Sequence, residues 1–316
     1  MTENRTLAKK SSIIFTVLVM VVTYAFVAWL YFSNAYQDPA IYTLSLSAMM
    51  FFPTLCSIVT RLATGENFTD MYLRPRFKGH VRFYLIAWLL PAVLTVAGAA
   101  FYFLIFPKRF DGSMGYYLSQ IAADAPEQVE AVKQIPVAAF ILYQIGMSLF
   151  IGLVNIIPAC GEELGWRGFF FPRLLEATKS PVCAMLISGV IWGVWHAPII
   201  ALGHNYGTEY AGYPWLGIIT MTVSCVAFGV ILCYVSYKAK SVWPAAIGHG
   251  ILNAGASVGM LLTTAENTPV LGPLTLALVA GVPTIIVAAV ILVKSKKIFC
   301  DEAEGGEESN VVIAAE

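Results

Sequence analysis

The sequence contains few charged residues, and its cysteines show no paired spacing. Only 12% of the 316 residues are charged, about half the share of a soluble globular domain. The six cysteines are scattered without a CxxC pair, which argues against a disulfide framework and a cysteine zinc site. Acidic and basic residues balance at 19 each, so charge gives no reason to expect a nucleic-acid partner. The 58% of apolar residues, arranged in long uncharged runs, is typical of multi-pass membrane proteins.

Eight apolar runs are long enough to cross a membrane as helices, which requires about 20 residues each. We therefore predict an all-α, polytopic membrane protein with about eight transmembrane helices. The expected spans are residues 12–32, 41–62, 82–106, 137–158 (with its helix continuing to about 171), 182–203, 215–237, 242–263 and 272–293. The first run is longer than the apolar region of a signal peptide, about 7–15 residues, so we interpret it as a retained span.

The basic residues support this arrangement of spans. With both termini in the cytoplasm, 16 of the 19 Lys and Arg residues fall on the cytoplasmic side, and only Lys108, Arg109 and Lys133 fall outside. This asymmetry follows the positive-inside rule. We divide the chain into a cytoplasmic segment 1–11, a single transmembrane domain 12–297 and an acidic tail 298–316, whose composition is typical of disorder. The longest connection, 107–136, is expected to contain a short amphipathic helix over 119–134.

Two adjacent glutamates, Glu162 and Glu163, follow the fourth apolar run. On a helix, Glu163 and Arg167 are i,i+4 neighbours that can form an ion pair. Glu162 is turned from Glu163 by about 100 degrees, so it is free to face a cavity. An oriented carboxylate in surroundings of low dielectric is what a general base requires. A solvated ion pair at an ordinary helix end would give the same pattern.

Two later runs carry the other polar side chains expected at membrane depth. His196 lies beside Trp192 and Trp195, where it could also hydrogen-bond a neighbouring carbonyl group. His249 and Asn253, spaced i,i+4, project from one helix face and offer two donors suited to an oxyanion, or to interhelical hydrogen bonds. Because ionisable groups within spans are costly, we expect these motifs to form one site from three helices. The expected site residues are Glu162, Glu163, Arg167, His196, His249 and Asn253.

The three motifs, in this order, resemble those of the CPBP family, the CAAX protease and bacteriocin-processing (Abi) family of intramembrane endopeptidases. They are Glu-Glu-x-x-x-Arg at 162–167, aromatic-x-x-x-His at 192–196 and His-x-x-x-Asn at 249–253. The resemblance covers a motif core of about residues 155–255. Trp192 stands where the family usually has phenylalanine, a change that we expect to alter packing rather than chemistry.

The resemblance implies a water-filled cavity open to the cytoplasmic leaflet. The composition and the bias of basic residues towards the cytoplasmic side suit a plasma membrane. The resemblance also implies hydrolysis of a peptide bond near the C-terminus of a lipid-modified or hydrophobic peptide or protein. By resemblance, Glu162 would activate the water and His196 would position it. His249 and Asn253 would stabilise the oxyanion, and the Glu163 ion pair would support them.

No cofactor is expected, although Zn²⁺ held by Glu162, His196 and His249 is possible. Metal-free chemistry is favoured because His249 beside Asn253 is better explained as an oxyanion clamp. The expected partners are a hydrophobic or prenylated substrate and membrane lipid, with no nucleic acid. The motifs His-Glu-x-x-His, Gly-x-Gly-Asp and Gly-x-Ser-Gly of other intramembrane proteases are absent. Two alternatives remain, a proton-coupled membrane transporter and a non-catalytic bacteriocin-immunity protein with the same fold.

Overall fold

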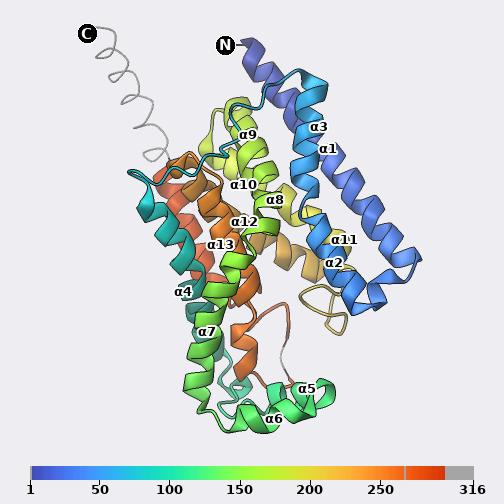
Figure 1. The fold of residues 1–316 in the computed structure, drawn as a ribbon, viewed down its shortest axis with the longest axis vertical. Helices are drawn as coiled ribbons and strands as arrows, with labels where there is room; N and C mark the ends of the chain where they lie inside the picture. Colours follow the sequence, from blue (N-terminus) through green and yellow to red (C-terminus); the bar gives the residue numbers. More distant parts are fainter. Residues whose placement is uncertain (1, 267, 296–316) are drawn as a thin grey trace.

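The computed structural model describes residues 2–266 and 268–295, and in these ranges the regular secondary structure is helical, apart from one isolated bridge between Phe110 and Thr263. The long helices run lengthwise, and α5 and α6 lie across one end (Figure 1). The predicted acidic tail 298–316 lies outside the described residues. The elements are α1 (Thr2–Phe32), η1 (Ala35–Gln37), α2 (Pro39–Met49), α3 (Phe52–Thr64), α4 (Val81–Ile105), η2 (Pro107–Arg109), α5 (Gly115–Asp124), α6 (Pro126–Lys133), α7 (Val137–Val154), α8 (Ile156–Gly165), η3 (Trp166–Phe170), α9 (Phe171–Thr178), α10 (Pro181–Trp195), α11 (Ala197–Ile200), α12 (Trp215–Ala239), α13 (Trp243–Gly255), η4 (Val258–Leu262) and a last helix over Val282–Ser295.

Helices of membrane-spanning length account for most of the predicted spans. Within the described residues, six helical segments are long and apolar enough to cross a membrane, and two shorter apolar helices accompany them. The six are Glu3–Phe32, Pro39–Thr64, Val81–Ile105, Val137–Val154, Trp215–Ala239 and Trp243–Leu262, and the two are Pro181–Trp195 and Val282–Ser295. The all-α, multi-pass class is therefore confirmed. The number of crossings and the side on which the termini lie stay predictions.

The second span is interrupted between α2 and α3, and this break positions the helix that carries the glutamates. Pro53 lies in the first turn of α3, and it has no N–H with which to continue the hydrogen bonding of α2 into α3. Gly165 of α8 lies so close that a Cβ atom there would be 2.4 Å from the Pro53 carbonyl carbon. The Thr54 hydroxyl donates a hydrogen bond to the Gly161 carbonyl oxygen. The absence of side chains on two glycines therefore lets the first motif pack directly against the start of α3.

The last predicted span, 272–293, is only partly helical. Pro273 and Pro283 have no N–H to donate, and the helix begins at Val282. The preceding backbone makes irregular hydrogen bonds instead, with Leu278 N 2.9 Å from Val270 O. Irregular backbone at membrane depth is tolerated where it is buried in protein, and Ala277 is fully buried. The segment thereby comes to line the interior of the bundle.

Arg61, which the charge count assigned to the cytoplasmic side, lies within α3 and is fully buried. Its guanidinium Nη1 is 2.6 Å from Asp70 Oδ1, and Asp70 also pairs with Arg173 of α9 at 2.8 Å. Burial raises the pKa of Asp70, but the two arginines outweigh burial and hold that pKa below its ordinary value. This network joins the end of α3 to α9 behind the candidate site.

The predicted amphipathic helix in the long connection is present as two pieces, α5 and α6, separated at Pro126. Val129 of α6 is buried, whereas Glu127 and Glu130 are exposed. The one-sided burial agrees with an amphipathic segment that covers the end of the bundle (Figure 1).

Candidate active site

The first motif lies where the helical backbone widens. α8 ends at Gly165 and is followed by one π-helical segment, η3, before α9 begins. Such π-helical turns occur often at functional sites. Every residue of η3 is buried, so Trp166 and Arg167 face protein rather than solvent.

Glu163 joins two helices through one oxygen atom. Its Oε1 is 3.0 Å from Arg167 Nη1 and 2.9 Å from His249 Nδ1, and Glu163 and Arg167 are fully buried. The predicted i,i+4 contact is therefore present. A carboxylate oxygen accepts hydrogen bonds, so Nδ1 of His249 carries the hydrogen. This bond fixes the ring of His249 and leaves its Nε2 for the pocket.

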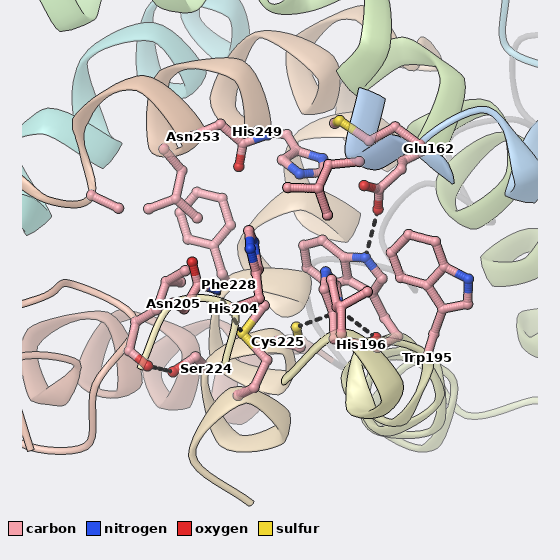
Figure 2. Close-up of a pocket in the computed structure, with 18 of the residues that line it drawn as sticks. Glu162, Trp195, His196, His204, Asn205, Ser224, Cys225, Phe228, His249 and Asn253 are labelled. Atoms are coloured by element: carbon pink, nitrogen blue, oxygen red, sulfur yellow. Dashed lines mark hydrogen bonds between the residues drawn. The ribbon is translucent and has the colours of Figure 1, made fainter. Parts of the chain in front are cut away.

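Glu162 is oriented by two indole N–H groups. Its Oε2 accepts from Trp192 Nε1 at 2.8 Å and from Trp166 Nε1 at 3.3 Å. The side chain is buried and lines a pocket (Figure 2). Because both indoles bind Oε2, the other carboxylate oxygen is left for a ligand in the pocket.

Trp192 makes a hydrogen bond as well as packing contacts. This corrects the expectation that replacing phenylalanine by tryptophan at this position changes packing alone. Besides the bond to Glu162, its ring lies 4.3 Å from the guanidinium carbon of Arg167, a cation–π contact. Its ring centroid is 5.4 Å from that of His249. Phenylalanine at this position would keep the ring contacts and lose the N–H donor. The tryptophan therefore changes the surroundings of the candidate base.

His196 follows α10 directly and lines the same pocket. Its Nδ1 is 2.8 Å from the Trp192 carbonyl oxygen, so Nδ1 donates and Nε2 is left as an acceptor. The hydrogen bond to a neighbouring carbonyl group, considered above as an ordinary structural role, is therefore present. His196 also lines the pocket, and this hydrogen bond fixes the tautomer of its ring.

The pocket has a volume of about 270 Å³. Four of the six predicted residues line it, brought together from α8, the end of α10 and α13. They are Glu162, His196, His249 and Asn253. The other two, Glu163 and Arg167, lie behind the wall and hold His249.

The possible metal set, Glu162, His196 and His249, stays a prediction. Among the described residues, no group of three His, Cys, Asp or Glu side chains is placed to hold a metal ion. His249 and His196 each donate from Nδ1 to a protein oxygen and keep Nε2 available, an arrangement that metal-binding histidines also show.

Sequence reasoning missed several residues of the pocket wall. His204, which directly follows the predicted span 182–203, lines the pocket together with Asn205. Ser224 and Cys225 of α12 line it as well. Only the adjacent polar pair His204-Asn205, next to an apolar run, could have indicated this. The turn that brings the pair back to the pocket is a tertiary feature that spacing does not show.

Apolar helices of membrane-spanning length around a pocket that contains Glu162, His196, His249 and Asn253 define a multi-pass membrane protein with its candidate site inside the bundle. Residues 144–255, which include all three motifs, match the family described as type II CAAX prenyl endopeptidase Rce1-like. The chain is also similar to CAAX prenyl protease 2 of Methanococcus maripaludis, with 30% identity over 146 residues, 46% of this chain and 49% of the relative. These matches support the resemblance to the CPBP family over the part of the chain that carries the three motifs. The chain matches about half the length of this curated relative.

Glu163→Gln should strongly destabilise the protein, because it leaves the buried Arg167 without a charged partner. Breaking a buried pair in this way typically costs about 3–5 kcal/mol. The measurement is the free energy of unfolding in detergent micelles. Glu176→Gln is the matched control, because Glu176 forms a partly exposed i,i+3 pair with Lys179, and such surface pairs are worth about 0–1 kcal/mol. Equal losses in the two variants would contradict the assigned role of Glu163.

Proposed function

We propose that this protein is an intramembrane endopeptidase that hydrolyses a peptide bond near the C-terminus of a hydrophobic or lipid-modified substrate. The observation that carries the proposal is the carboxylate of Glu162, oriented by two indole donors, in one pocket with His249 and Asn253. The family match over 144–255 and the name of the relative support this reaction class. The predominance of basic residues in the connections predicted to be cytoplasmic favours a site towards the cytoplasmic leaflet.

In the proposed first step, Glu162 accepts a proton from water as the water oxygen attacks the scissile carbonyl carbon. The buried carboxylate suits this role because low dielectric favours its taking up a proton. Nε2 of His196, available as an acceptor, holds the second hydrogen of the water. Glu162 then gives its proton to the leaving amine, so the peptide C–N bond breaks and the base is restored.

The negative charge that develops on the carbonyl oxygen needs hydrogen-bond donors. The amide of Asn253 supplies N–H groups directly. His249 can donate from Nε2 only when its ring carries both protons, because Nδ1 already donates to Glu163. The carboxylate of Glu163 favours that charged ring, so Glu163 supports the oxyanion site through His249.

Glu162→Gln should reduce the rate of cleavage by about 10²–10⁴-fold, the usual contribution of a general base. The measurement is mass-spectrometric detection of products from a prenylated C-terminal peptide and from an unmodified hydrophobic peptide. Glu130→Gln, which alters an exposed pair in α6, serves as the control and should retain full activity. Cleavage by Glu162→Gln at the wild-type rate would refute the proposal, and pH-driven ion flux in liposomes without proteolysis would favour a transporter.

Trp192→Phe should lower the rate of cleavage about 10- to 100-fold, because one of the two donors to the Glu162 carboxylate is lost. Hydrogen bonds to charged groups are worth about 1.5–3 kcal/mol. The ring stacked on Arg167 remains, so the fold is retained. Trp88→Phe is the control, since its indole donates to the Leu149 carbonyl at 3.2 Å and does not line the pocket. Unchanged kcat in Trp192→Phe would show that this indole does not act on the base.

We infer that the reaction proceeds without a bound metal, because His249 and Asn253 line the pocket together, where they suit an oxyanion. Cleavage should therefore persist after treatment with 1,10-phenanthroline, with the metal content of the treated protein checked by mass spectrometry. Loss of activity that is restored by added Zn²⁺ would instead support a metalloprotease.

A further inference from the structure

The pocket has a second polar end that the proposed reaction does not use. His204 and Asn205 lie on the turn after α11 and line the same cavity as Glu162. Figure 2 shows them entering the pocket from the side opposite His249 and Asn253. Polar groups at both ends of a largely apolar cavity are typical of sites that fix the orientation of a ligand.

The turn that presents the two side chains is firmly held. Gly203 N is 2.9 Å from Ile200 O, and Gly207 N is 2.8 Å from Gly203 O. Tyr206 is buried, and its hydroxyl donates to the Leu276 carbonyl oxygen at 2.6 Å. Asn205 has a φ of 65°, in the left-handed region that asparagine and glycine tolerate best. The turn therefore holds the two polar side chains in fixed positions.

His204 is oriented by a hydrogen bond with a residue of α2. Its Nδ1 is 3.2 Å from the hydroxyl of Tyr42 on α2. Burial lowers the pKa of His204 to about 4, so its ring is neutral at pH 7. A neutral imidazole offers one donor and one acceptor. With Nδ1 bound to Tyr42, Nε2 is the atom that a ligand can reach.

Asn205 retains hydrogen-bonding capacity for a ligand. Its Nδ2 is 3.9 Å from the sulfur of Met221, and a thioether sulfur is only a weak acceptor. A side-chain amide with a free oxygen and N–H matches the C=O and N–H of one peptide unit. None of the described residues that line the pocket is Lys or Arg, so a neutral peptide unit suits this end better than a charged carboxylate.

The surrounding wall suits apolar side chains of a peptide. Met49 and Met50 come from the end of α2, and Met221 comes from α12. Methionine side chains adapt to apolar groups of different shape. The wall thus accommodates varied residues, while the polar end recognises what all peptides share.

We propose that His204 and Asn205 form a backbone-binding subsite, which hydrogen-bonds one peptide unit beside the scissile bond and thereby sets the register of the substrate. The inference rests on the proposed endopeptidase function. It assigns a specific task to residues that neither activate water nor stabilise the oxyanion.

The first test measures binding without cleavage. In a Glu162→Gln background, a fluorescently labelled hydrophobic peptide should bind with Kd raised about 3- to 10-fold by Asn205→Gly or by His204→Ala, the loss expected for one hydrogen bond. Glycine keeps the left-handed backbone of the turn, so Asn205→Gly removes only the amide. Asn34→Gly is the matched control, because Asn34 has a φ of 56° and does not line the pocket. It should leave Kd unchanged.

The second test identifies the contact. In a series of substrates, each backbone amide is replaced in turn by an ester, which removes one N–H donor. One ester should raise KM about 3- to 10-fold for the wild-type protein and have no effect on Asn205→Gly, with kcat little changed in both. A purely structural role for Asn205 would not produce this dependence on one substrate atom. Substrates ending in a carboxylate or a carboxamide should have equal KM.

The outcomes separate the two proposals. Cleavage by the wild type with unchanged Kd and KM in both variants would overturn the subsite and leave the endopeptidase assignment intact. Peptide binding that depends on His204 and Asn205 without any cleavage would support the subsite and overturn the assignment. Absence of peptide binding in every form would overturn the subsite.

Discussion

The shared oxygen of Glu163 is the contact on which the rest of the site depends. It accepts hydrogen bonds from Arg167 in η3, the segment that follows α8, and from His249 on α13. One atom therefore connects these three helical segments. The charged groups of Glu163 and Arg167 do not contact solvent, because both side chains are fully buried. The cost of removing such charges from water is offset only when the partners are held in good geometry.

Trp192 extends this arrangement to a third helix. Its N–H binds Glu162, its ring covers Arg167, and its carbonyl oxygen accepts from His196. One residue of α10 therefore touches the candidate base, its ionic support and the second imidazole. The positions of these groups are coupled, so substitutions among them should not have additive effects.

The parts that could be predicted from the sequence are those that depend on local periodicity. The contact of Glu163 with Arg167 follows from 3.6 residues per turn, and so does the outward turn of Glu162 towards the pocket. The bond from Glu163 to His249 joins residues that are 86 positions apart, and no spacing rule gives it. His204 was missed for the same reason, because a turn rather than a helix returns it to the pocket. The helix of the last span begins later than predicted. Hydropathy, on which the prediction was based, does not take account of the missing N–H groups of Pro273 and Pro283.

The irregular segment before the last helix contributes to the cavity through its main chain. The carbonyl oxygen of Leu276 accepts hydrogen bonds from both Tyr206 and Ser224. Any side chain of suitable size at position 276 preserves these bonds, whereas loss of either hydroxyl leaves a buried acceptor less well satisfied. We therefore expect position 276, which supplies the acceptor from its main chain, to tolerate substitution. Tyr206 and Ser224, whose side chains supply the donors, should tolerate it less.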